Sequence, residues 1–122
     1  MNPIVATKPI TYDEMKLVTD NCEKYLFYDR IIEKMSEQLA PDFQFDIINV
    51  TSLNKEQFLY GIETFYKLVI KVEESTWKCE NLGVPGVALW LIYSKQEQNP
   101  DVSAKGITYD ITSQVVATFE RV

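Results

Sequence analysis

Asp29 is the acidic residue best placed for acid–base chemistry in this sequence of 122 residues. It falls in a gap of a helical stripe of apolar residues, one turn after Tyr25 and Leu26 and before Ile32. In a continuous helix Asp29 would face inward, where loss of hydration would raise its pKa and suit it to proton transfer. If the helix bends here instead, Asp29 is solvated or pairs with Arg30. The sequence leaves both alternatives open.

Several tyrosines could assist such an acid. In an apolar cavity a phenol can donate a hydrogen bond to a carbonyl oxygen and stabilise the negative charge that develops on it. The more common role of a tyrosine is to fill the core while its hydroxyl reaches the surface. The candidates are Tyr25, Tyr60, Tyr66, Tyr93 and Tyr109.

Other catalytic and cofactor motifs are absent from the sequence. It has no histidine, so the commonest general base is missing. It also has no Gly-rich phosphate loop, no Cys-x-x-Cys metal spacing and no nucleophile elbow. Cys22 and Cys79 lie among apolar neighbours and are expected to be reduced core residues. We therefore expect no metal site and no cofactor.

The composition is that of a soluble globular domain. Apolar residues make up 46% and charged residues 25%, and the net charge of −6 disfavours nucleic-acid binding. No stretch approaches the ~18 apolar residues that span a bilayer. Asn49 begins a glycosylation sequon, but the N-terminus does not resemble a signal peptide. We expect an intracellular, cytoplasmic protein without membrane contact.

The first half of the chain reads as helix, strand and helix. After an extended arm over residues 1–10, Thr11 and Glu14 have capping-box spacing, and the apolar stripe predicts one helix, or two with a kink, over residues 12–39. Pro41 ends it. Residues 43–48 alternate as a half-buried strand, with Phe43, Phe45 and Ile47 on one face and Asp46 on the other. A short helix follows, which Asn54 and Gln57 can cap.

The second half reads as strands. They are expected over residues 66–73, 77–82, 87–94 and 107–122, with a turn over residues 84–86 and a polar loop over residues 96–105. Both faces of residues 87–93 are apolar, whereas a strand with one solvent-exposed face would alternate between apolar and polar residues. We assign Leu89, Leu91 and Tyr93 to the helix side. A partner subunit would then cover the interface residues, which are Ala88, Trp90, Ile92, Val116 and Thr118.

This layout resembles the nuclear transport factor 2-like superfamily, a cone-shaped α+β fold that includes SnoaL-like polyketide cyclases and ketosteroid isomerases. The likeness rests on residues 39–46 (Leu-Ala-Pro-Asp-Phe-Gln-Phe-Asp), on residues 54–65 as the third helix and on residues 107–119 as the last strand. Catalytic members of the family usually place an acid or a histidine on the pocket side of the first strand. Here Ile47 falls where that base would be expected, and Asp46 points away.

The resulting prediction is one α+β domain over residues 1–122. A long N-terminal helix, either continuous or kinked, and a short second helix pack on a strongly bent antiparallel sheet of about four to five strands. We expect a non-catalytic homodimeric binding module for a small apolar ligand or another protein. One alternative is a cyclase- or isomerase-type enzyme that uses Asp29 with a tyrosine. Another is an acidic inhibitor or immunity-type protein that blocks a partner protein. The residues expected to line the mostly apolar pocket are Tyr25, Phe43, Phe45, Ile47, Tyr66, Tyr93 and Tyr109.

Overall fold

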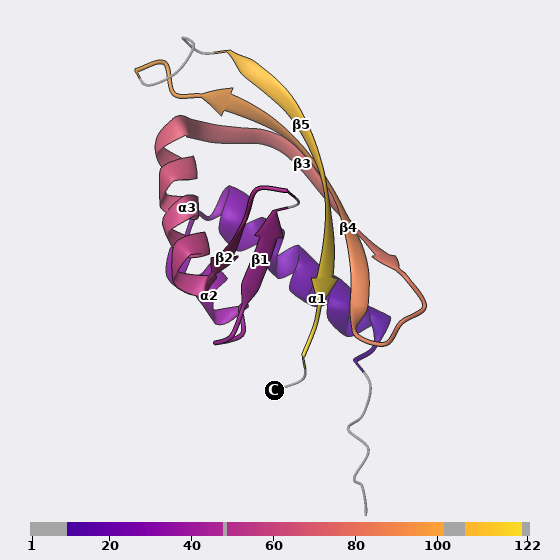
Figure 1. Cartoon of the computed structure of the whole chain (residues 1–122). Helices are drawn as coiled ribbons and strands as arrows, with labels where there is room; N and C mark the ends of the chain where they lie inside the picture. The colour runs from indigo at the N-terminus through magenta and orange to yellow at the C-terminus, as the bar shows by residue number, and fades with distance from the viewer. Residues whose placement is uncertain (1–9, 48, 102–106, 121–122) are drawn as a thin grey trace, which may run out of the picture.

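The N-terminal helical segment is divided in the computed structural model, which describes residues 10–47, 49–101 and 107–120. Helix α1 spans Tyr12–Glu23, the π-helical turn η1 spans Lys24–Tyr28, and α2 spans Ile32–Glu37 (Figure 1). The predicted capping box is formed at the start of α1, where the Glu14 N–H donates to the Thr11 hydroxyl at 3.2 Å. The predicted N-terminal arm lies outside the described residues, apart from Ile10.

The kink lies at Arg30, whose backbone φ is +54°. In the preceding π turn, the Asp29 N–H donates to the carbonyl of Lys24, five residues back, at 2.8 Å. This wide turn and the left-handed residue after it end the helix, so that the chain changes direction before Ile32. The kinked alternative predicted from the sequence is therefore confirmed.

A small hairpin and a long helix come next. Strand β1 (Gln44–Ile47) pairs antiparallel with β2 (Thr51–Asn54), which the sequence did not predict. Asn54 caps α3 (Lys55–Leu68) through a capping box with Gln57. Tyr66 and Leu68 belong to this helix, so the predicted strand over residues 66–73 begins too early. The predicted alternation was ambiguous because Phe58, Ile62 and Tyr66 also recur at the spacing of a helix.

Three long strands form the main sheet. Strands β3 (Val69–Asn81), β4 (Val87–Gln98) and β5 (Thr108–Thr118) are joined in the antiparallel order β3-β4-β5. The tight turn before β4 requires Gly86, because its φ is +74° and an added Cβ would lie 3.1 Å from the Phe119 carbonyl oxygen. The predicted loop over residues 96–105 starts too early, since β4 runs to Gln98. The α+β class is confirmed, with the described strands in two antiparallel sheets.

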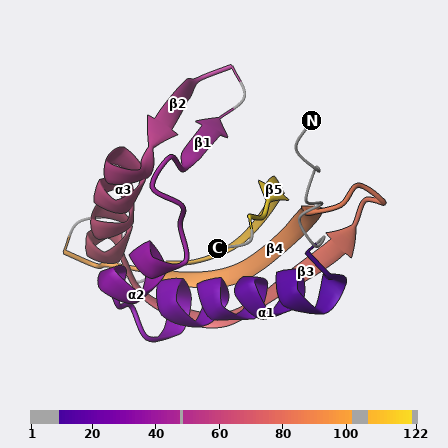
Figure 2. The same ribbon diagram turned by 90° about the horizontal axis from the view of Figure 1, so that it is seen from below.

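The helices cover the inner face of the main sheet along β3 and β4, whereas Tyr109 and Ile111 on the same face of β5 are 43% and 39% exposed. Figure 2 shows α1 lying against β3, with α3 and the β1–β2 hairpin at one end of the curved sheet. The core lies on this inner face, where Trp77 contacts Phe27 edge to face with ring centroids 5.2 Å apart. A second cluster joins Met15 of α1 to Cys79 and Ala88. No helix covers the opposite, outer face in the part of the chain that the structure describes.

The sequence-based assignment of the β4 faces is wrong. Ala88 has no exposed surface, and Trp90 and Ile92 pack against the core, so these residues point toward the chain's own helices. They are therefore not available to a partner subunit. Both faces of β4 are apolar, so alternation alone could not decide which one faces the helices. Val116 and Thr118, by contrast, do lie on the outer face, through their pairing with Leu89 and Val87.

Candidate interaction surface

Asp29 lies at the surface and not in a cavity. It follows η1 and its carboxylate lies 3.9 Å from the ammonium group of Lys24, with 37% of the side chain exposed. The prediction of an inward-facing, desolvated acid is wrong because the π turn rotates the chain away from the helical register on which it depended. The second sequence alternative, a solvated and paired Asp29, is the observed one, with Lys24 as the partner in place of Arg30.

Tyr25 and Tyr66 lie together beside the kink. The Tyr66 hydroxyl donates to the Leu26 carbonyl oxygen at 2.7 Å, and the guanidinium of Arg30 lies 4.9 Å from the centre of the Tyr66 ring. Burial raises the pKa of Tyr66 to about 12, and the charge of Arg30 partly opposes that rise. Burial also lowers the pKa of Arg30. This hydrogen bond joins the kinked segment to α3. The Tyr66 hydroxyl is therefore bonded within the protein and is not directed at a substrate.

The first strand contacts α3 as its alternation predicts. Phe43 and Phe45 both contact Phe58, with ring centroids 5.0 and 5.3 Å apart. Asp46 points away and accepts a hydrogen bond from Ser52 on the neighbouring strand at 2.6 Å. Ile47 was predicted to share the buried face of Phe43 and Phe45, but 38% of its surface is exposed.

The remaining tyrosines are separated from this group. Tyr93 lies on the outer face of the main sheet, where its hydroxyl donates to the Asp110 carboxylate at 3.0 Å. Tyr109 is paired with the buried Gln96 and so lies on the inner face. Tyr60 is exposed on α3. The residues predicted to line one pocket therefore occupy different parts of the molecule, and the structure does not bring them together.

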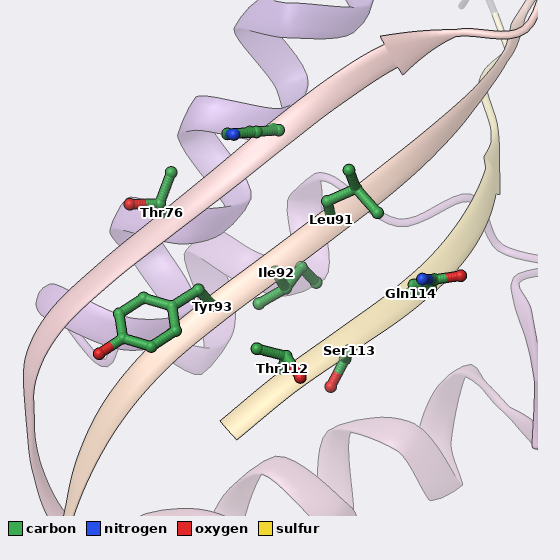
Figure 3. A pocket seen from close by; sticks show the side chains of 8 residues that line it. Thr76, Leu91, Ile92, Tyr93, Thr112, Ser113 and Gln114 are labelled. Carbon is green, nitrogen blue, oxygen red and sulfur yellow. The ribbon is translucent and has the colours of Figure 1, made fainter. Parts of the chain in front are cut away.

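An open depression lies on the outer face of the sheet. Its volume is about 540 Å³, and Figure 3 shows its lining side chains over β3, β4 and β5. The outer-face residues that line it are Thr76, Lys78, Leu91, Tyr93, Thr112 and Gln114. Most of these carry hydroxyl, amide or aliphatic groups, and none is an acid or a thiol. Such a lining can bind another surface by packing and hydrogen bonding. Its groups able to transfer a proton are Lys78 and Tyr93, and the Tyr93 hydroxyl is already bonded to Asp110.

The apolar centre of this face lies on β4 and β5. Leu89, Leu91 and Tyr93 follow one another along β4, and Val116 beside Leu89 has 65% of its surface exposed. Charged residues stand around this centre. Lys78 and Glu80 lie on β3, and a row of Glu74, Lys95 and Asp110 crosses the three strands. An apolar centre with a polar rim is the usual anatomy of a protein interface.

One feature of the sequence could have predicted which face of β4 is turned away from the helices. Ala88 is the smallest apolar residue of β4, and a closely packed helix favours a small residue beneath it, here next to Met15. Had Ala88 been assigned to the helix side for that reason, the alternation along β4 would have left Leu89, Leu91 and Tyr93 outside. The predicted interface would then have matched Val116 and Thr118.

Neither a metal site nor a membrane-spanning helix is found within residues 10–47, 49–101 and 107–120. No group of three or more His, Cys, Asp or Glu residues there could hold a metal ion. No helix in these ranges is both long and apolar enough to cross a membrane. No protein-family model matches the chain, and neither a curated protein nor a solved structure gives a significant match.

Proposed function

We propose that the protein is a non-catalytic homodimeric interaction module and that two copies pack through the outer faces of their β3-β4-β5 sheets. The observation that carries this proposal is an apolar centre that no described helix covers, in which Leu89, Leu91 and Tyr93 are half-buried and Val116 is 65% exposed. A contiguous exposed apolar patch with a polar rim usually marks a binding site. The exposure of Asp29 and the absence of histidine support a binding role over the enzymatic alternative.

Charge complementarity favours a second copy as the occupant. Lys78 and Glu80 are successive outer-face residues of β3. A two-fold axis that crosses the strands midway between their rows places each Lys78 opposite the partner's Glu80. The same axis sets Leu89 against the partner's Leu91. The face can thus meet its own copy with opposite charges at the rim and apolar side chains at the centre.

Replacement of Leu91 tests the proposal. Leu91→Glu would bury an unpaired charge at the centre of the interface, so it should turn the dimer into a folded monomer. Light scattering at tens of micromolar measures the mass, and circular dichroism checks the fold. Leu17→Glu is the matched control, because Leu17 is 61% exposed on α1 and away from this face. A monomeric unmodified protein, or an equal effect of both variants, would refute the proposal.

A further inference from the structure

The two edges of the main sheet differ in how they resist pairing with another strand. Strand β3 has two register shifts along its pairing with β4, and its charged residues include Lys71, Glu73 and Glu74. Bulges and charges are the usual devices that protect an exposed edge. Strand β5 pairs with β4 without a register shift from Thr108 to Thr118, and it contains neither proline nor glycine. Its edge lacks these protections.

The hydrogen bonds at the two ends of β5 show which backbone groups face this open edge. The Phe119 N–H donates to the Gly86 carbonyl at 2.7 Å, and the Ile107 carbonyl accepts from the Gln98 N–H at 3.0 Å. Both residues have odd numbers, and in an antiparallel strand each residue directs its N–H and C=O to the same side. The even-numbered residues therefore direct their backbone groups outward. They are Thr108, Asp110, Thr112, Gln114, Val116 and Thr118.

We infer that the β5 edge docks the β5 edge of a second copy in antiparallel orientation, so that the two main sheets become one continuous sheet. Asp110 is the only charged residue of β5, so pairings centred on Thr112, Ser113 or Gln114 bring no like charges face to face. Centred on Ser113, the pairing places Ile111 opposite the partner's Val115. A second copy supplies a free edge of the same length and low charge, which suits main-chain pairing.

This edge contact is separate from the proposed face-to-face dimer. Edge pairing uses outward N–H and C=O groups, whereas face packing uses side chains above the sheet. Both contacts have two-fold symmetry and use different groups of the sheet, so they can coexist in a larger assembly with two kinds of interface. Each contact can therefore fail in an experiment without the other.

Hydrogen exchange measured by NMR tests the edge directly. Between tens of micromolar and about 1 mM, the amides of Thr112 and Gln114 should become at least about tenfold more protected, because pairing covers them. The amides of Ser113 and Val115, which face β4, should change little. The same measurement on Leu91→Glu reports on edge pairing alone, because that variant removes the face-to-face contact. Persistence of the rise in Leu91→Glu supports edge pairing even if the face dimer proves wrong.

Two substitutions at one position complete the test. Thr112→Pro removes an outward N–H without taking a hydrogen bond from the β4 ladder, and should abolish the concentration-dependent protection. Thr112→Val has nearly the same shape and keeps the N–H, so it should preserve the protection. Even-numbered amides that stay unprotected at every concentration would overturn the inference. Full protection under conditions where light scattering shows a monomer would overturn it too, because a segment of the same chain would then cover the edge.

Discussion

At the scale of single residues, burial and hydrogen bonding account for the groups whose pKa values are shifted. Cys22 is 1% exposed, and burial raises the pKa of its thiol to about 12. Such a thiol is a core residue and a poor nucleophile, as its apolar neighbours in the sequence suggested. On the outer face, the hydrogen bond that Tyr93 donates to Asp110 raises the pKa of Tyr93. Both shifts keep the proton on its group at neutral pH.

The pH dependence of stability follows from Cys22. Its folded pKa of about 12 lies above the ordinary value of 9.0, so the folded state holds the proton more tightly than the unfolded chain. The resulting stability is complete below about pH 9 and is lost as the pH rises from 9 toward 12. Urea unfolding across this range should show the loss, and Cys22→Ala should reduce its slope. An unchanged slope in Cys22→Ala would contradict the assignment.

Phe27 anchors the core between the kink and the sheet. It contacts Trp77 edge to face and stacks with Phe65 at 5.9 Å between ring centroids. Phe27→Ala should lower the free energy of unfolding by about 3–5 kcal/mol, because it leaves a cavity lined by aromatic rings. Tyr60→Ala, at a position 70% exposed, should change it by less than about 0.5 kcal/mol. Urea unfolding of both variants measures the difference.

At the scale of elements, short local signals determine where the helices begin, and long-range packing determines which face of a strand is buried. Both predicted capping boxes are formed, at Thr11 and at Asn54. The kink at Arg30 has no such simple local signal, since its left-handed backbone is supported by the ring of Tyr66 on a distant helix. The inner face of β4 is likewise decided by α1, whose Met15 packs near Ala88.

The cap of α3 gives a test at this scale. The side chain of Asn54 accepts from the Gln57 N–H at 2.8 Å, and the Gln57 side chain accepts from the Asn54 N–H at 2.9 Å. Asn54→Ala should therefore cost about 1 kcal/mol in the free energy of unfolding, whereas Asn54→Ser should retain most of the cap. Equal losses in the two variants would show that the cap is not the cause.

The faces of β4 can be tested in the same way. Trp90→Glu places a charge beneath the helices, beside Trp77 and Phe119, and should lower the free energy of unfolding by more than about 3 kcal/mol. Leu89→Glu places the charge on the outer face and should leave the isolated chain folded. Thermal and urea unfolding distinguish the two. A well-folded Trp90→Glu variant would contradict the observed face assignment.

At the scale of the whole molecule, the helices cover one face of a curved sheet along β3 and β4. Within the described residues, the other face and the β5 edge are left uncovered. The proposed homodimer uses the outer face, and the inferred strand pairing uses the β5 edge. The two together predict an average mass that rises with concentration beyond that of a dimer. In this case Leu91→Glu should form only edge-paired dimers. Thr112→Pro should form only face-packed dimers, because residue 112 lies outside the apolar centre of that face. Sedimentation equilibrium of the two variants and of their combination, which should be monomeric, measures this.

The sequence by itself determined the features that depend on neighbouring residues. The capping boxes, the end of the helical segment before Pro41, the turn at Gly86 and the alternation along β5 follow from local geometry. Only the tertiary structure decided that Asp29 is exposed, that Tyr66 is helical and that Ala88 faces inward. Each of these depends on a contact between segments far apart in the chain. Periodicity predicts which residues share a face, but only packing decides which face is buried.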